Sequence, residues 1–249
     1  MNQKELEKYS RSIIMQDIGI EGQLNIKNAK IFVFGCGGIS NGLLLNIASS
    51  GVNQVGICDD DNIELSNLQR QYIYKESNVG KKKVHIAKKA IKNINKSMTI
   101  KTYQKQLNED TFQYYSNIIK NYDIIVDTTD NFKTRSLINK LCIKSSKTLF
   151  SSSCIGYEIH FYFFQSYIKD NPCYNCIFEN PSDITTCQNS GIFPGIASIS
   201  GNILFSLIMK YIINADDLSI FKKMYVFNFK NFQLKSINIA PDANCKNHK

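Results

Sequence analysis

Residues 31–38 read Ile-Phe-Val-Phe-Gly-Cys-Gly-Gly, and residues 59–71 read Asp-Asp-Asp-Asn-Ile-Glu-Leu-Ser-Asn-Leu-Gln-Arg-Gln. The apolar start of the first segment predicts a buried parallel strand, and its glycines predict a tight turn into a helix. A second predicted strand, Val55–Cys58, ends immediately before Asp59. Strand, glycine turn, helix, strand and acid in this order predict a nucleotide-binding βαβ unit. The turn binds phosphate and the acid binds ribose hydroxyls in such a unit; the turn residues are Gly35, Gly37 and Gly38.

A polar run follows Asp59 and suits phosphate better than nicotinamide. It contains Asn67 and Arg70, whereas an ordinary dinucleotide fold needs only one carboxylate at this point. Asp59 could instead be a helix cap or a turn residue. Asp61 could serve the ribose pocket of Asp59 or only the turn in which it lies. Lys83 would add positive charge near a triphosphate, although spacing alone cannot choose between it and the two lysines that precede it.

The next acidic segment, Asp127–Asn131, follows the fourth predicted strand. The carboxyl ends of strands in a doubly wound sheet face the ligand crevice, so this segment is expected at the same edge as Asp59. A carboxylate opposite phosphates suits Mg²⁺, and Asp130 is the candidate ligand. Asp130 could instead, or in addition, cap the helix that follows.

Strands and helices alternate through the first 153 residues, which predicts a doubly wound, mainly parallel α/β sheet. Beyond residue 153, β-forming runs predict antiparallel strands at the C-terminal edge of the same sheet. We therefore expect one domain over residues 1–249, with a nucleotide-binding half (1–153) and a second half (154–249). The predicted helices are 4–19, 40–50, 81–95, 109–120, 133–144 and 196–213, and the predicted strands are 31–34, 55–58, 99–103, 123–127, 148–150, 158–164, 224–229 and 233–239.

Bulk composition excludes several classes of protein. The apolar stretch Ile196–Ile213 is interrupted by polar residues, which favours a core helix over a membrane span. The net charge of +9 comes from dispersed lysines, so no nucleic-acid partner is predicted. Only three of the 30 basic residues are arginines, namely Arg11, Arg70 and Arg135. Each is expected where a planar fork of donors meets a phosphate or a carboxylate.

Eight cysteines and no secretory leader predict thiol or metal chemistry in a reducing compartment, the cytoplasm. Cys173 and Cys176 form one pair, and Cys245 and His248 form another, each with two intervening residues. Two such pairs predict a tetrahedral structural Zn²⁺ site that fixes the tail; a redox pair and unliganded tail residues are the alternatives. Cys187 stands alone in a polar loop as an available thiol. The remaining four, Cys36, Cys58, Cys142 and Cys154, are expected in the core.

Together these residues resemble the ThiF/MoeB/HesA family, bacterial relatives of ubiquitin-activating enzymes, over nearly the whole chain. The most specific segment is Asn67–Gln71, combined with the pair Asp130 and Asn131. The resemblance also includes Tyr9-Ser10-Arg11, the glycine turn, Asp59, Asp61, Gly80, Lys83, Asp127, Arg135, the pair Cys173 and Cys176, Cys187 before Gly191, and the terminal ligand pair.

The resemblance implies a reaction: ATP adenylylates the C-terminal Gly-Gly carboxylate of a ubiquitin-like sulfur carrier protein and pyrophosphate is released. It implies that Asp59 binds ribose, that Asn67, Arg70 and Lys83 bind the triphosphate, and that Asp130 holds Mg²⁺. It also implies a homodimer, because Arg11 would reach the nucleotide site of the neighbouring protomer. A cysteine desulfurase or another persulfide donor is the implied sulfur source. The attacking carboxylate needs no general base.

Within the family, the early Lys-Tyr-Ser-Arg and the Asp-Asp-Asp run look like the ThiF branch, which acts on ThiS, the sulfur carrier of thiamine thiazole synthesis. There Cys187 would join the carrier through an acyl disulfide. A carrier of molybdopterin synthesis is the alternative. Three departures stand out: Ser40 replaces a glycine, which we expect to weaken the turn slightly, Ser12 replaces a glutamine, and the last zinc ligand is His248.

Three other classes fit less well. A nicotinamide oxidoreductase would explain the glycine turn and Asp59, but not Asn67, Arg70 or the metal ligands. A non-enzymatic adaptor would have lost nucleotide-binding residues, and all of them are present. A basic nucleic-acid binder would lose affinity steeply with added salt.

Overall fold

The protein is described by a computed structural model that covers residues 1–178, 191–214 and 219–248. For His248 only the backbone is described. Its strands are β1 (Lys30–Phe34), β2 (Gln54–Cys58), β3 (Thr99–Tyr103), β4 (Ile124–Asp127), β5 (Thr148–Ile155), β6 (Glu158–Phe164), β7 (Lys223–Asn228) and β8 (Gln233–Asn238). Its helices are α1 (Gln3–Lys8), α2 (Ser10–Ile13), α3 (Gly19–Asn28), α4 (Gly38–Ser50), α5 (Lys83–Ile94), α6 (Phe112–Ile119), α7 (Phe132–Lys144), α8 (Tyr174–Ile177) and α10 (Ile196–Ile213).

The eight strands form one sheet in the order β3-β2-β1-β4-β5-β6-β7-β8. The first five strands in this order, β3, β2, β1, β4 and β5, pair parallel. Strand β6 pairs antiparallel with β5, β7 with β6, and β8 with β7. This arrangement confirms the predicted doubly wound sheet with an antiparallel C-terminal edge. The strand order reverses direction between β1 and β4, the place where such sheets open a ligand crevice at their carboxyl ends.

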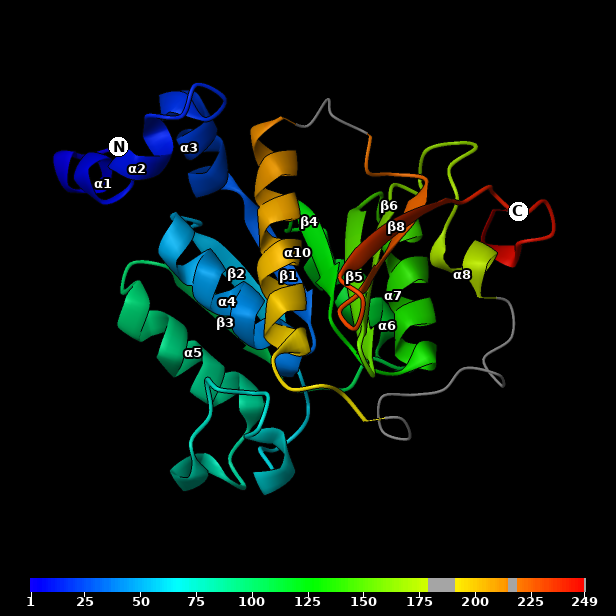
Figure 1. Cartoon of the computed structure of the whole chain (residues 1–249), viewed down its shortest axis with the longest axis horizontal. Helices are drawn as coiled ribbons and strands as arrows, with labels where there is room; N and C mark the ends of the chain where they lie inside the picture. The colour runs from blue at the N-terminus through cyan, green and yellow to red at the C-terminus, as the bar shows by residue number, and fades with distance from the viewer. Residues whose placement is uncertain (179–190, 215–218, 249) are drawn as a thin grey trace.

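Helices cover both faces of the sheet, and alternate residues of each strand enter different cores. Ile31 and Val33 pack with α4, α5 and α10, whereas Phe32 and Phe34 pack with α6 and α7. Figure 1 shows the first group of helices in front of the sheet and α6 and α7 behind it. Gly51 ends α4 in a left-handed conformation (φ +104°), as the sequence predicts.

The predicted single N-terminal helix over residues 4–19 is wrong. A capping box between Asn2 and Glu5 starts α1, and Tyr9 ends it by donating its N–H to two carbonyls of the last turn. The helix α2 is short, and a third helix begins at Gly19, whose φ of +56° redirects the chain. Residues 20–28, which lie outside the predicted helices and strands, belong to α3, whose Gln23 donates a hydrogen bond to the carbonyl of Ser50 (2.9 Å). That contact joins segments far apart in sequence, so no local pattern indicates it.

The long helix α10 belongs to the core on one face only. By length and composition it could span a membrane, but in the fold it packs against α4, α3, β5 and β6. Its other face lines an open groove of about 580 Å³ against the β7–β8 hairpin. This apolar groove is lined by Phe161, Phe163, Ile199, Ile203, Leu207, Ile220, Tyr225, Phe227, Phe229, Phe232 and Leu234.

Helices α10 and α4 approach most closely at Gly201, where a methyl group would overlap the carbonyl oxygen of Ile39. We expect Gly201→Ala to lower the free energy of unfolding by about 1–3 kcal/mol, because overpacking exceeds the gain in helix propensity of about 1 kcal/mol. Urea denaturation measures the change, and Ser206→Ala on the exposed face of α10 is the control. Equal stability of Gly201→Ala and wild type would contradict this packing.

Candidate active site

The glycine turn lies between β1 and α4 and is held against the end of β4. Gly35 has φ +91°, and a Cβ there would lie 2.9–3.0 Å from Thr128 atoms. Ser40 is fully buried; its Oγ donates to the Gly35 carbonyl (2.7 Å) and lies 2.5 Å from Thr128 Oγ1. The expectation that Ser40 weakens the turn is therefore wrong, because its hydroxyl links the turn to β4.

Asp59 braces the same turn from the end of β2. One of its carboxylate oxygens accepts the N–H of Cys36 (2.7 Å) and the other accepts the N–H of Asp61 (2.9 Å). Burial raises the pKa of Asp59 to about 6, against the opposing effect of the nearby Lys83 ammonium. These hydrogen bonds confirm the alternative role of Asp59 as a turn residue, and its role at a ribose stays a prediction.

Among the three consecutive lysines, Lys83 is the one that faces the cleft at the carboxyl ends of the parallel strands. Its side chain is buried, lines the cleft and forms an ion pair with Asp61 (2.7 Å). Burial disfavours its charge, but Asp59 and Asp61 outweigh that effect and raise the pKa of Lys83. Lys81 and Lys82 instead donate to backbone carbonyls.

The segment after β2 brings its polar side chains to the same cleft. Asn67 is buried in a short 3-10 helix and accepts the N–H of Glu64 (3.2 Å). Arg70 donates to the carbonyl of Ser66 (3.0 Å) and lines the cleft. Gln71 is also buried there, and its side-chain oxygen has no hydrogen-bond partner among the described residues. Its place in the motif Asn67–Gln71 is the sequence signal for this position, although the motif alone predicts no role for it.

The two acids after β4 have different environments. Asp127 is buried, accepts from Ser151 (2.8 Å) and lies 3.8 Å from the Arg135 guanidinium. Arg135 also donates to Ser151 Oγ and to the carbonyls of Thr129 and Ser152, so its fork joins β4 to β5. This confirms a carboxylate partner for one of the three arginines.

Asp130 is exposed on the cleft wall, with no hydrogen-bond partner found in the described part of the chain. The alternative that it caps α7 is wrong, because Asn131 is the cap and accepts the N–H of Thr134 (2.8 Å). An exposed carboxylate free of protein partners is suited to hold a Mg²⁺ ion that also contacts phosphate.

The residues predicted to bind the nucleotide and Mg²⁺ line one cleft of about 880 Å³. The glycine turn, Asp59, Asp61, Asn67, Arg70, Lys83 and Asp130 form one end of it. The other end is formed by β5, β6 and α8, with lining residues Ser153, Cys154, Ile155, His160, Tyr162, Tyr174 and Phe178. Arg11 does not line this cleft. It is exposed on α2, which Figure 1 shows at the upper left of the molecule, whereas the loop between β2 and α5 lies at the lower left.

Three cysteines form a second site near the C-terminus. The sulfur of Cys173 lies 3.6 Å from that of Cys245 and 3.8 Å from that of Cys176. A tetrahedral Zn²⁺ with Zn–S bonds of about 2.3 Å separates its sulfur ligands by about 3.8 Å, so the three thiols fit such an ion. Burial raises the pKa of Cys245 to about 12, and a bound Zn²⁺ would favour the loss of its proton. The side chain of His248 lies outside the described residues.

The four cysteines that the sequence predicts to lie in the core are buried there. Cys36, Cys58, Cys142 and Cys154 are buried, and burial raises the pKa of the first two to about 12. Such thiols are unreactive. Cys187 lies outside the described residues; Gly191, four positions later, lines the cleft.

The doubly wound sheet with a cleft at the carboxyl ends of its strands defines an α/β protein with a Rossmann-type fold. The chain matches the ThiF family over residues 9–247, and it belongs to that family. It is 36% identical over 219 residues to adenylyltransferase and sulfurtransferase MOCS3 of Culex quinquefasciatus, covering 87% of this chain and 49% of the relative. It is 33% identical over 246 residues to a probable molybdopterin-synthase adenylyltransferase of Gracilaria tenuistipitata var. liui, covering 98% and 68%.

The chain thus spans about half the length of the MOCS3 relatives that it matches. Among solved structures, E. coli MccB crystallised with AMPCPP and MccA has the same fold, with a TM-score of 0.82 at 22% identity. That alignment covers 96% of this chain and 73% of MccB. PaaA aligns with a TM-score of 0.81 at 20% identity over 96% of this chain and 84% of its own.

We expect the purified protein to contain about one zinc ion per chain, held by Cys173, Cys176 and Cys245. Cys245→Ser should lose most of this zinc and lower the melting temperature, because metal binding contributes on the order of 10 kcal/mol to folding. Metal analysis and thermal denaturation with and without a chelator measure both effects. Cys142→Ala, outside the cluster, should keep its zinc; a zinc-free but fully stable wild type would exclude the site.

Proposed function

We propose that this chain is an adenylyltransferase that uses ATP to adenylylate the C-terminal Gly-Gly carboxylate of a ubiquitin-like sulfur carrier protein, releasing pyrophosphate. The observation that carries the proposal is the convergence on one cleft of the glycine turn, Asp59 and Asp130 from three strand ends, and of Lys83 from the start of α5. The names of the MOCS3 and molybdopterin-synthase relatives agree with it.

In the proposed reaction, the side chains of the cleft position the nucleotide and neutralise its charge. Asp59 would accept the ribose hydroxyls, while Asn67, Arg70 and Lys83 would bind phosphate oxygens. Asp130 would hold Mg²⁺, which supplies charge neutralisation on the phosphates when bound. The carrier's carboxylate attacks the α-phosphate, and catalysis comes from placement and electrostatics.

The second half of the chain, residues 154–249, would bind the folded carrier. The aromatic end of the cleft, formed by Tyr162, Tyr174 and Phe178, suits a tail that has no side chains. After adenylylation, Cys187 would join the carrier through an acyl disulfide, with sulfur from a cysteine desulfurase or another persulfide donor. The free thiols Cys36 and Cys58 agree with a cytoplasmic protein.

Two carriers are candidates. The motif resemblance favours ThiS, the carrier for thiamine thiazole synthesis, whereas the relatives' names favour the molybdopterin carrier. ATP–pyrophosphate exchange with each purified carrier separates them. Exchange with only one carrier assigns the pathway, and exchange with neither would overturn the proposed substrate class.

We expect Lys83→Ala and Asp130→Asn each to lower pyrophosphate exchange by about 10²–10³-fold, because each removes charge stabilisation of the reacting phosphates. Lys81→Ala is the matched control: it removes a neighbouring lysine that bonds only a backbone carbonyl, so exchange should stay within about two-fold of wild type. If Lys81→Ala and Lys83→Ala are equally active, the assignment of the phosphate-binding lysine is wrong.

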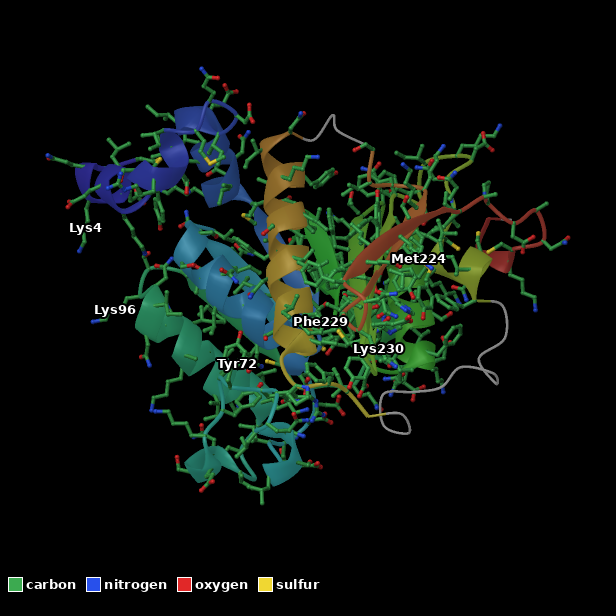
Figure 2. The ribbon with its side chains drawn as sticks, viewed as in Figure 1. Lys4, Tyr72, Lys96, Met224, Phe229 and Lys230 are labelled. Carbon is green, nitrogen blue, oxygen red and sulfur yellow. The ribbon has the colours of Figure 1, made fainter. Side chains whose placement is uncertain are left out.

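We also propose that the apolar groove between α10 and the β7–β8 hairpin is the interface with a second copy of this chain. Phe232 and Leu234 are 76% and 65% exposed at its rim, and Figure 2 shows Phe229 beside α10. An exposed, wholly apolar surface of this kind marks an interaction site. The distance of α2 from its own cleft agrees with Arg11 serving the site of a neighbour.

Leu207→Asp should convert a dimer into monomers, because a carboxylate would be buried in the groove without a partner. Sedimentation velocity measures the mass, and circular dichroism checks the fold. Asn117→Asp, on α6 behind the sheet, adds the same charge elsewhere and should leave the dimer intact. A monomeric wild-type protein would refute the proposed interface.

A further inference from the structure

A row of hydrogen bonds follows β6 into the aromatic end of the cleft. Asn228 donates to Glu158 Oε1 (3.0 Å), Glu158 Oε2 lies 3.1 Å from His160 Nε2, and His160 Nδ1 lies 3.2 Å from the Tyr162 hydroxyl. The side chain of Ser153, opposite His160 on β5, also hydrogen-bonds Tyr162. Ser153, His160 and Tyr162 all line the cleft.

The chemistry of these groups gives the row a direction. The carboxylate of Glu158 can only accept, so His160 carries its proton on Nε2. The other ring nitrogen is then an acceptor for the Tyr162 hydroxyl. A carboxylate behind a histidine in this way fixes the tautomer and stabilises the imidazolium that forms when the ring takes up a proton.

Adenylylation makes no use of this row, because a carboxylate nucleophile carries no proton to remove. The step that consumes the acyl adenylate is different. When a thiol or a persulfide attacks the acyl carbon, its sulfur must lose a proton, since the thiolate is the reactive form. A proton acceptor in the cleft therefore has a purpose in the second reaction and none in the first.

We propose that His160, oriented by Glu158 and acting through Tyr162, accepts the proton of the sulfur nucleophile that attacks the carrier adenylate. The proposal rests on the proposed function. In the step, a C–S bond forms at the acyl carbon and the acyl C–O bond to AMP breaks, with AMP leaving with the electron pair. The S–H proton passes to the Tyr162 oxygen while the proton of Tyr162 passes to His160 Nδ1.

The surroundings of the row support this direction of transfer. The side chain of His160 is 21% exposed and that of Glu158 is 39% exposed, so the far end of the row can exchange protons with solvent. Burial raises the pKa of Tyr162, which disfavours a stable phenolate and favours a hydroxyl that passes its proton on. The other charges acting on the row are Arg135 on α7, near Tyr162, and Lys235 on β8, near Glu158.

The test compares two nucleophiles in a Cys187→Ser background, so that only the added sulfur compound reacts. The carrier adenylate is formed with ATP, and AMP release is followed after addition of either N-acetylcysteamine or hydrosulfide. N-acetylcysteamine is mostly protonated at neutral pH and needs a base, whereas hydrosulfide is largely ionised.

We expect His160→Gln to slow AMP release with the thiol by about 10²-fold, the usual contribution of a general base. With hydrosulfide the loss should be only a few-fold, and pyrophosphate exchange should stay within about two-fold of wild type.

Glu158→Gln keeps the histidine but removes the charge behind it, and should give a smaller loss that again affects only the thiol. His85→Gln on α5, outside the cleft, is the matched control and should leave both reactions unchanged. Equal losses with both nucleophiles, or no loss with the thiol, would overturn the proton-acceptor role. A wild-type protein without pyrophosphate exchange would instead overturn the proposed function, and this proposal with it.

Discussion

The end of the cleft that is formed by the glycine turn depends on the two hydrogen bonds that the Asp59 carboxylate accepts. The carboxylate accepts backbone N–H groups from Cys36 in the glycine turn and from Asp61 in the following loop. The turn is thereby joined to β2, while Ser40 and Thr128 join it to β4. Three strand ends are fixed together in this way, and backbone donors remain in the turn for a phosphate.

Burial gives this arrangement its electrostatic character. Burial raises the pKa of Asp59 to about 6. The buried ammonium of Lys83 compensates the negative charges of both Asp59 and Asp61. A buried ammonium beside two carboxylates stays charged in the absence of ligand. A polyanionic nucleotide would therefore meet a preformed positive group, and little reorganisation would be needed.

The antiparallel edge of the sheet gives its two faces different environments. On the α10 face, β6 and the β7–β8 hairpin present aromatic side chains to the apolar groove. On the other face the same β6 presents Glu158, His160 and Tyr162 in one hydrogen-bonded row. The two-residue period of a strand allows β6 to serve an apolar surface and a polar cleft at once.

The sequence by itself determined the doubly wound sheet and the meeting of the glycine turn, Asp59 and Asp130 at one edge of it, since periodicity and short-range motifs carry both. It did not determine α3 or the roles of Ser40, Asp127 and Arg135, because these depend on contacts between segments far apart in the chain. The choice of Lys83 over its neighbours depended on burial, which three adjacent lysines do not show. The predicted strand 158–164 places Glu158, His160 and Tyr162 on one face, but only the tertiary structure placed that face in the cleft, because the cleft is formed by segments far apart in the chain.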